Sequence, residues 1–481
     1  MSHKIKLVMI FTMLIGGFFG LLNETLLTTA LPKIMQDLNV DYTQVQWLIT
    51  AFLLTNGIAI PLSAFITQRF TTRQVFITAV SIFLVGTLLG AVSPDFNTLL
   101  AARIIQALGS GMMMPLMMTT ILDIFPPDQR GKYMGMFGLV IGLAPAIGPT
   151  LSGYLVEYFH WRALFYVVAP IALIALLISL KFVKNVGTTV KLPIDMLSVV
   201  LSILGFGGIL YGTSAIAHDG WENPVVLVSI IGGMILVTLF VIRQLKLEVP
   251  LLNFSVFKNR QFSIGLIIMA FTMVSMIGSE TVLPMFVQNL LGHTALESGL
   301  MLLPGAIVMG IMSVLSGILF ERYGAKILSI IGMSIVIITT TFFVFMTTDT
   351  TALTITTVYT IRMVGLALGL MPLMTHTLNQ LDMHMNAHGA SMTNTVQQIA
   401  ASIGTAILIT IMTHATKQFS PVASDYSGSK MEIAHAMKED ALLHGYNTAF
   451  LFAVIISVIS LICAFMLTSK KNTPTVQSTE Q

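Results

Sequence analysis

The sequence predicts an all-α polytopic membrane protein, and two observations carry that prediction. Of the 481 residues, 55% are hydrophobic and only 9% are charged, whereas soluble globular domains carry about 25% charged residues. Apolar runs of the length that crosses a bilayer as a helix, about 20 residues, follow one another along the whole chain. The stretches between them are too short for a separate soluble enzyme domain, so we do not expect an enzyme.

We count fourteen such runs and expect each to form one transmembrane helix. They are 7–31, 46–68, 75–93, 97–121, 133–156, 163–183, 196–217, 225–242, 263–287, 297–320, 326–346, 352–376, 391–414 and 446–468. The first run is longer than the apolar core of a signal peptide, so we expect it to be retained as the first span.

The distribution of charge predicts the orientation of these helices. Most of the 24 Lys and Arg residues fall on one set of alternate loops, and cytoplasmic loops are the ones enriched in basic residues. The bias therefore places both chain termini in the cytoplasm. Trp47, Trp161 and Trp221 fall at the opposite boundaries, where tryptophan anchors helices at the interface. Cys463 is the single cysteine, so we expect no disulfide framework, no metal site and no cofactor.

Three patterns occur twice along the chain at nearly the same offset. They are Ala64-x-Ile66-x-Gln68-Arg69 with Gly317-x-Leu319-x-Glu321-Arg322-x-Gly324, Arg103 with Arg362, and Glu24 with Glu280, each acid standing shortly before a Leu-Pro pair. Repeats of this kind are typical of transporters built from two related halves. We therefore expect six-helix halves at 1–190 and 246–470, inserted helices 7 and 8 at 191–245, and a cytoplasmic tail at 471–481.

The fifth run, Gly135 to Gly153, has an unusual composition for a membrane helix. Its small residues let a neighbouring helix approach closely, and its prolines, Pro145 and Pro149, each remove one helical N–H. Lipid offers no replacement hydrogen-bond partner. We therefore expect a bent helix that is packed against protein and acts as a hinge and seal.

Glu24 and Glu280 are the candidate proton-coupling acids. A charged side chain at the centre of a membrane helix costs about 2.5–3.5 kcal/mol, so such residues usually serve a function. Burial raises the pKa of a carboxyl group and an approaching cation lowers it, so a proton and a cationic drug would compete for the same carboxylate. The alternative is that one acid pairs permanently with Arg103 or Arg362.

The other buried polar residues leave two interpretations open. Arg103 serves either proton transfer or the bridging of helices, since its planar donors suit carboxylates and carbonyls. A further set either lines a polar cavity or forms hydrogen bonds between helices: Asn56, Gln106, Arg362, Asn394 and Gln397. The two copies of the loop motif provide candidate gating residues: Arg69, Arg73, Gly317, Glu321, Arg322 and Gly324.

Several motifs, in order, together resemble one known family. They include Leu22-Asn23-Glu24-Thr25, Arg103-x-x-Gln106-x-x-Gly109, Gly135-x8-Ala144-x3-Gly148-Pro149-x2-Ser152-Gly153, Trp161-Arg162-x-x-Phe165, Leu283-Pro284, and His388-Gly389 with Asn394 and Gln397. The chain resembles the major facilitator superfamily and, within it, the fourteen-span drug:proton antiporters of the EmrB/QacA type, including lincomycin-resistance-like multidrug exporters. The resemblance covers essentially the whole chain.

This resemblance implies the major facilitator fold, with fourteen transmembrane helices as two six-helix halves plus two inserted helices. It implies an antiporter motif made of Gly135, Ala144, Pro145, Gly148, Pro149 and Gly153, and a role for Arg103 in proton transfer. The chain departs from the family where Asn23 replaces the usual aspartate of the first span. Gln68 likewise replaces the acid of the first loop motif, which is thought to gate through contact with a helix dipole. The second copy, with Glu321 and Gly324, is better preserved.

We therefore expect a proton-coupled multidrug efflux antiporter in a bacterial cytoplasmic membrane. It would export lipophilic, often cationic drugs or antibiotics by alternating access, as a monomer in the lipid bilayer. The sequence contains no phosphate-binding loop ending in Gly-Lys-Ser/Thr and no nucleic-acid-binding motif. One alternative is export of an endogenous amphiphile such as a fatty acid, a bile-like compound or a siderophore. Another is a membrane sensor that only binds ligands.

Overall fold

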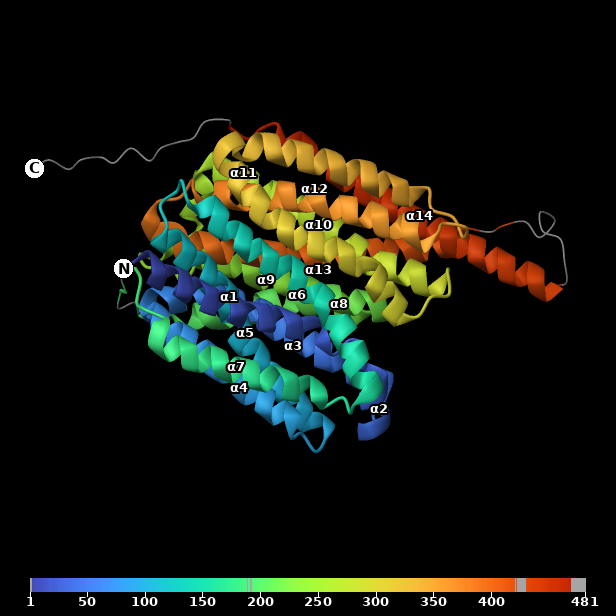
Figure 1. Cartoon of the computed structure of the whole chain (residues 1–481), viewed down its shortest axis with the longest axis horizontal. Coiled ribbons are helices and arrows are strands. Elements are labelled where there is room, and N and C mark those ends of the chain that lie inside the picture. The colour runs from blue at the N-terminus through green and yellow to red at the C-terminus, as the bar shows by residue number, and fades with distance from the viewer. Residues whose placement is uncertain (1, 188, 191–192, 420, 422–429, 469–481) are drawn as a thin grey trace, which may run out of the picture.

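The computed structural model describes residues 2–187, 189–190, 193–419, 421 and 430–468. The expected tail at 471–481 lies outside these described residues. The α-helices are α1 His3–Leu26, α2 Leu31–Leu38, α3 Tyr42–Arg69, α4 Thr72–Ala91, α5 Phe96–Ile124, α6 Arg130–Tyr158, α7 Ala163–Phe182, α8 Met196–Asp219, α9 Pro224–Lys246, α10 Arg260–Asn289, α11 Ala295–Val344, α12 Ala352–Leu378, α13 Asn386–Gln418 and α14 Lys430–Ala464. Short 3-10 helices lie at Phe254–Lys258 and Met383–Met385. The long helices run side by side in one bundle (Figure 1).

The predicted number of spans is confirmed. Among the described residues, 13 helices are long and apolar enough to cross a membrane. One of them, α11, is 50 residues long and contains two spans that meet at Gly324, where φ is 76° and ψ is 167°. Twelve single spans plus these two give fourteen. The short helix α2 is too short to be a span and connects α1 to α3.

Helix starts follow ordinary capping chemistry. The residues that cap α3, α4 and α11 are Asp41, Thr71 and Thr294, respectively. The side-chain oxygen of each accepts a hydrogen bond from the backbone N–H three residues later, and each belongs to a complete capping box. The helix α14 begins at Lys430, well before the predicted span 446–468, and α13 ends at Gln418, a short way beyond the predicted span 391–414. Hydropathy did not reveal these extensions because they are polar.

The helices form two packed groups. Helices α1, α3, α4, α5 and α7 pack mainly with one another, and helices α10–α14 do the same, while α6 packs on α1 but makes its most extensive contact with α11. In Figure 1 the first group occupies the lower part of the view in blue to teal, and the second the upper part in yellow to red. The two groups meet where α6 packs on α11 and where α3 packs on α13. The exact boundaries 1–190, 191–245 and 246–470 stay a prediction.

The pair α8–α9 packs beside the line where α3 meets α13. Leu210 of α8 fits against Gly57 of α3, and Thr213 lies 2.6 Å from Ser402 of α13, hydroxyl to hydroxyl. At one end Arg243 donates two hydrogen bonds to Asp195, at 2.7 and 2.9 Å. These bonds are the main reason that the pKa of Asp195 falls to about 2. The inserted pair therefore contacts both groups of helices.

Gly324 offers a direct test of the turn inside α11. Its backbone conformation is one that only glycine adopts easily, and forcing another residue into it costs about 1–3 kcal/mol. We expect Gly324→Ala to lower the midpoint of thermal unfolding of the purified protein in detergent. Gly232→Ala is the matched control, because Gly232 is helical in α9 and a Cβ there meets nothing within 4 Å. An equal midpoint for the two variants would contradict the strained turn.

Candidate functional site

Arg103 is the centre of a buried polar network in the first group of helices. The side chain is fully buried on α5. Its Nη1 donates to Asn23 Oδ1 at 2.6 Å and to Gln106 Oε1 at 3.1 Å, and its Nη2 donates to the Asn23 carbonyl at 3.1 Å. Its Nε donates to the Leu48 carbonyl at 3.2 Å. The guanidinium also lies 4.1 Å from the centre of the Phe52 ring, a cation–π contact.

This network joins four helices. Asn23 belongs to α1, Leu48 to α3 and Arg103 to α5, while Gln106 Nε2 donates to Thr87 Oγ1 of α4 at 2.9 Å. The geometry favours the bridging interpretation of Arg103. Gln106 is fully buried and forms hydrogen bonds between helices. Asn23, at the position where an aspartate was expected, supplies Arg103 with a neutral acceptor in place of a carboxylate.

Arg362 occupies the corresponding place in the second group. It is fully buried on α12. Its Nη2 donates to the Ser275 carbonyl of α10 at 3.2 Å and its Nε donates to Thr340 Oγ1 at 3.3 Å. Its Nη1 has no hydrogen-bond partner within the described part of the chain. Each arginine thus donates to a backbone carbonyl of the helix that carries the acid, α1 for Arg103 and α10 for Arg362. Arg362 forms fewer hydrogen bonds than Arg103.

Glu24 and Glu280 lie on α1 and α10, and both side chains are half-buried. Arg103 is the charged group that acts on Glu24, and Arg362 is the one that acts on Glu280. Neither acid forms an ion pair within 4.0 Å among the residues that the structure describes. The expected alternative of a permanent pair with arginine is therefore not what this conformation shows. A buried arginine acts electrostatically on each acid without forming an ion pair with it.

The remaining cavity candidates lie between helices. Asn56 is nearly buried on α3. Asn394 and Gln397 are half-buried on α13, where Asn394 Nδ2 lies 3.7 Å from Met118 Sδ of α5 and Gln397 Nε2 lies 3.5 Å from Met269 Sδ of α10. Both amides thus point toward methionines of other helices. Methionine is a flexible, polarizable lining for varied apolar ligands.

The helix α6 packs on α11 at its beginning and on α1 further along. A Cβ added at Gly135 would overlap the backbone of Ser313 in α11, and one at Gly148 would overlap Thr25 Oγ1 of α1. Ala144 is fully buried, whereas Gly153 is only loosely covered by Leu296. The expectation that this proline-containing helix packs against protein is confirmed at these positions. The roles of its motif residues as hinge and seal stay a prediction.

The two copies of the loop motif make different contacts. Arg73 Nη2 donates to the Leu180 carbonyl at 2.5 Å, a contact within the first group of helices. In the second copy, Glu321 Oε1 accepts from the backbone N–H of Lys132 at 3.3 Å. Lys132 lies in the first turn of α6, where the helix dipole favours a negative charge. The better-preserved copy is thus the one that places an acid on a helix N-terminus of the opposite group.

Of the other loop-motif residues, Gly317 and Arg322 lie near this contact, and Arg69 lies at the end of α3. Arg69 ends α3 near the rings of Phe65 and Phe70. Gly317 approaches the backbone of Gly131 in α6, where a Cβ would overlap the Gly131 carbonyl oxygen. Arg322 stacks near Tyr323, 5.4 Å from the ring centre.

Three further hydrogen bonds between the two groups gather at the same end of the bundle. Arg130 Nη1 donates to Asn379 Oδ1 at 2.7 Å. Asn386 Nδ2 donates to Asp123 Oδ1 at 2.9 Å. The hydroxyls of Ser63 and Ser391 lie 2.8 Å apart. The sequence analysis missed these residues, because each pair is separated by more than 240 positions and forms no local motif.

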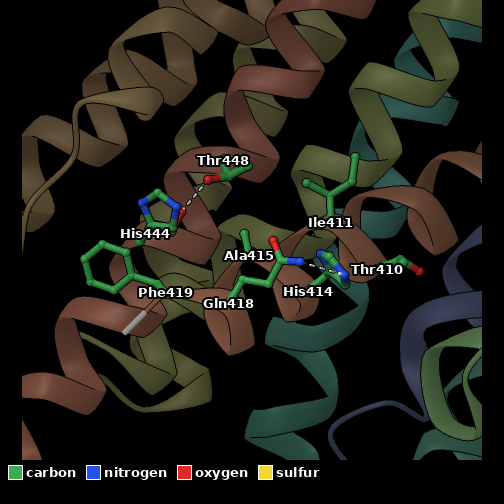
Figure 2. A pocket seen from close by; sticks show the side chains of 8 residues that line it. All are labelled: Thr410, Ile411, His414, Ala415, Gln418, Phe419, His444 and Thr448. Atoms are coloured by element: carbon green, nitrogen blue, oxygen red, sulfur yellow. Dashed lines mark hydrogen bonds between the residues drawn. The ribbon is translucent and has the colours of Figure 1, made fainter. Parts of the chain in front are cut away.

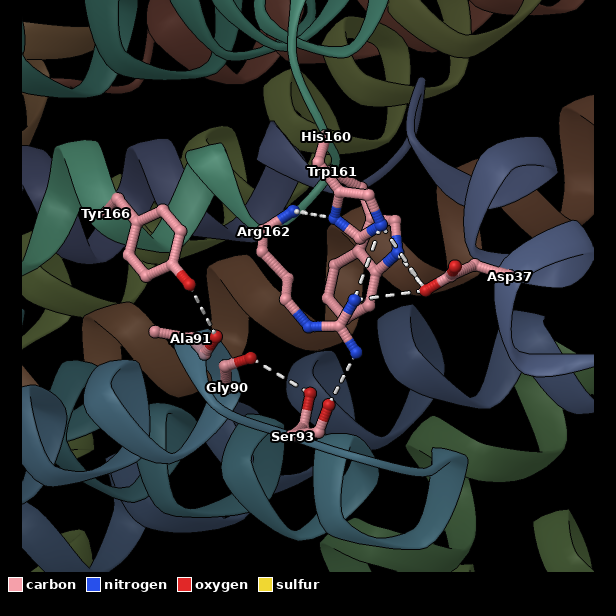
Figure 3. A network of polar contacts seen from close by, with 8 residues as sticks. All are labelled: Asp37, Gly90, Ala91, Ser93, His160, Trp161, Arg162 and Tyr166. Atoms are coloured by element: carbon pink, nitrogen blue, oxygen red, sulfur yellow. Dashed lines mark hydrogen bonds and ion pairs between the residues drawn. The ribbon is translucent and has the colours of Figure 1, made fainter.

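At the opposite end, Trp161-Arg162 takes part in a polar network that sequence analysis did not predict (Figure 3). Trp161 Nε1 and Arg162 Nη1 each donate to Asp37 Oδ2 at 3.0 Å, and Arg162 Nη2 donates to the Ser93 carbonyl at 2.7 Å. These donors, Trp161 first, lower the pKa of Asp37. The network fastens the connection between α1 and α3 to the loops after α4 and α6.

A pocket of about 580 Å³ lies between α13 and α14 (Figure 2). It is lined by Thr410, Ile411, His414, Ala415, Gln418, Phe419, His444 and Thr448. It contains neither of the candidate acids, so its place in the fold is separate from the Arg103 and Arg362 networks.

Two helical groups, each with a half-buried acid and a buried arginine that acts on it, linked by hydrogen bonds that gather at one end, are typical of a polytopic membrane transporter. A family model described as the Major Facilitator Superfamily matches residues 13–405. The chain therefore belongs to the major facilitator superfamily.

Curated relatives extend over almost the whole chain. An uncharacterized MFS-type transporter of Bacillus subtilis, YcnB, is 46% identical over 96% of this chain and 94% of its own length. The lincomycin resistance protein LmrB of Listeria innocua is 41% identical over 98% of both chains. Among solved structures, the human organic anion transporter MFSD10 (TETRAN) superposes with a TM-score of 0.63. At 13% identity over 95% of this chain and 99% of that one, it shows the fold alone.

The two arginines are expected to differ in their contribution to stability. Lysine offers a single ammonium group, so Arg103→Lys would leave several of its four acceptor contacts unmade, at about 1–3 kcal/mol for each buried acceptor left without a partner. Arg362→Lys would lose two. Thermal unfolding in detergent should show the larger drop in midpoint for Arg103→Lys. A larger drop for Arg362→Lys would contradict the bridging interpretation.

Proposed function

We propose that this protein is a proton-coupled efflux antiporter that exports lipophilic, often cationic drugs or antibiotics by alternating access. The observation that carries the proposal is the pair Glu24 and Glu280. Each is a half-buried carboxylate on a membrane helix, one in each group of helices, with a buried arginine acting on it and no ion-pair partner among the described residues.

In this mechanism a proton and a cationic substrate exclude one another from a shared carboxylate. A ligand shifts a conformational equilibrium only through its different affinity for the two states, so proton and substrate must each favour a different state of the carrier. The membrane potential supplies about 2.3 kcal/mol per net charge moved per 100 mV. Two protons exchanged for a singly charged cation, or one for a neutral substrate, move one net charge, which exceeds the ~1.4 kcal/mol of a tenfold substrate gradient. Asn23 and Arg103 would set the charge around Glu24. The polarity of the substrate path would be set by the remaining polar residues: Asn56, Gln106, Arg362, Asn394 and Gln397.

The contacts of α6 and α11 support an assignment of the gate. Glu321, Gly317 and the α6 N-terminus lie at the end of the bundle where hydrogen bonds between the groups gather. If the basic loops face the cytoplasm, as proposed from their charge, this end is the cytoplasmic gate in a closed position. Breaking the contact between Glu321 and the helix N-terminus would open it. In the same assignment, both termini lie in the cytoplasm and the protein works as a monomer in the bacterial cytoplasmic membrane.

Substrate class is supported by relatives rather than by the site alone. LmrB, at 41% identity, is named for lincomycin resistance, which favours drug export over export of a fatty acid, a bile-like compound or a siderophore. The membrane sensor is a weaker alternative because it would have no need of a titratable acid in each half. A solute flux assay separates a carrier from a sensor.

The proposal is tested by substrate-driven proton movement in proteoliposomes. We expect the wild-type protein to exchange protons for ethidium or lincomycin. Glu24→Gln and Glu280→Gln should each reduce this proton movement, because glutamine cannot release a proton. Substitution of the more important acid should reduce it to background. Glu222→Gln is the matched control, since Glu222 is exposed in the turn between α8 and α9. Unchanged proton coupling in both membrane variants would show that these acids are not the coupling groups.

Gly148 provides a separate test of the bent helix. A Cβ at this position already overlaps Thr25, so we expect Gly148→Leu to force α1 and α6 apart and to abolish export while Glu24 and Glu280 are intact. Gly232→Leu is the matched control, because Gly232 lies in α9, outside the antiporter motif, and a Cβ there meets nothing within 4 Å. Export at the wild-type rate by Gly148→Leu would contradict a hinge at this position.

A further inference from the structure

Pro149 leaves an unsatisfied acceptor inside α6. Proline has no N–H, so the carbonyl of Pro145, four residues earlier, lacks its usual helical donor, and lipid supplies none. The hydroxyl of Thr25 in α1 lies 3.2 Å from this carbonyl oxygen and donates to it. The other acceptor within reach of the hydroxyl is the Leu22 carbonyl of its own helix, at 3.4 Å.

Gly148 makes the contact possible. A side chain at this position would overlap Thr25 Oγ1, so only glycine lets the hydroxyl reach the carbonyl. In the turn that follows α1, Thr29 Oγ1 donates to Ser152 Oγ of α6 at 2.6 Å. The end of α1 and the turn after it are thus joined to α6 by one hydroxyl bond to a backbone carbonyl that proline has freed, and by a second between two side chains.

The residues on both sides of Glu24 are anchored, whereas Glu24 is not. Asn23 is held by Arg103 through its side chain and its carbonyl. Thr25 is held by the Pro145 carbonyl. These anchors come from different helices, α5 and α6, and α1 ends immediately afterwards at Leu26. The position of the Glu24 carboxylate therefore depends on where α6 lies relative to α5.

The other end of α6 is attached to the opposite group of helices. Its first turn donates to Glu321 through the Lys132 N–H, and Gly135 packs on the Ser313 backbone. Glu321 therefore contacts the same helix whose freed carbonyl holds Thr25. These contacts form one continuous connection from the gate to the last turn of α1.

We propose that Thr25 is a positioning residue, which transmits the state of α6 to Glu24 through its hydrogen bond to the Pro145 carbonyl. The proposal rests on the proposed function in one respect, that Glu24 carries a proton. When α6 shifts on opening of the gate, the Pro145 carbonyl withdraws from Thr25, the last turn of α1 loses one of its two anchors, and Glu24 changes its exposure. Thr25 itself contacts neither proton nor substrate.

The test compares Thr25→Val, which keeps the shape and loses the donor, with Thr25→Ser, which keeps the donor. Thr29→Val is the matched control, because it removes the neighbouring hydroxyl bond to α6. In proteoliposomes we expect Thr25→Val to shift the pH profile of ethidium export and to lower the number of protons exchanged per substrate. Thr25→Ser and Thr29→Val should match wild type, which a merely structural role of the hydroxyls would not produce.

A second measurement does not depend on proton coupling. In a chain with Cys463→Ser and Glu24→Cys, the rate of labelling by a water-soluble maleimide reports the exposure of position 24. We expect Thr25→Val to change this rate about threefold or more, the factor that corresponds to the ~0.6 kcal/mol average of interhelical hydrogen bonds in membranes. Thr25→Ser should leave it unchanged.

The outcomes separate the two proposals. If wild type exchanges no protons for substrate, the proposed function fails, and the labelling rates alone decide the role of Thr25. If wild type is coupled but Thr25→Val matches it in pH profile, proton ratio and labelling rate, the Thr25 proposal is overturned and the proposed function stands. If Thr29→Val changes the same quantities as much as Thr25→Val, the effect belongs to general packing between α1 and α6 and the proposal is likewise overturned.

Discussion

The absence of water from the hydrocarbon region is the constraint on which this structure depends. Every buried polar group there needs a partner supplied by the protein. Arg103 meets the requirement by collecting acceptors from α1, α3 and α5, and in doing so it fixes how these helices pack. The carbonyl freed by Pro149 meets it with the hydroxyl of Thr25. Helix packing in this bundle therefore depends on pairing its buried polar groups. Glu24 stands between two residues that other helices hold by hydrogen bonds, Asn23 by Arg103 of α5 and Thr25 by the Pro145 carbonyl of α6.

The two groups of helices differ in how completely their buried polar groups are hydrogen-bonded. Every guanidinium nitrogen of Arg103 has an acceptor, the neutral Asn23 among them, whereas Arg362 keeps an Nη1 without a partner in the described residues. The loop motifs are unequal in the opposite sense. In the first copy Gln68 bonds within its own helix, to the Ala64 carbonyl, while in the second Glu321 reaches the N-terminus of α6. One group thus supplies the rigid arginine network and the other the contact between groups.

How much the sequence could predict follows from the range of each interaction. Hydropathy found the fourteen spans, including the two within α11, because a span is defined by its own residues. Motif spacing found Arg103, Glu24 and Glu280, because charge is costly in a membrane wherever it stands. The partners of these residues were out of reach. Asp37 with Arg162, and Asp123 with Asn386, are brought together only by the packing of distant helices, and α2 is too short and too polar for hydropathy to reveal.

The glycines and prolines of α6 show where a local pattern and a distant contact meet. The composition of the helix predicted that it packs on protein, but not which residues it meets or why the glycine stands one position before the second proline. The structure gives the reason: Pro149 frees the Pro145 carbonyl, and Gly148 leaves the space through which Thr25 reaches it. A proline without the glycine would leave a buried carbonyl unpaired, and a glycine without the proline would leave Thr25 no acceptor in α6. Gly148 and Pro149 therefore act together: both are needed for the hydrogen bond from Thr25, which lies in the turn of α1 that carries Glu24.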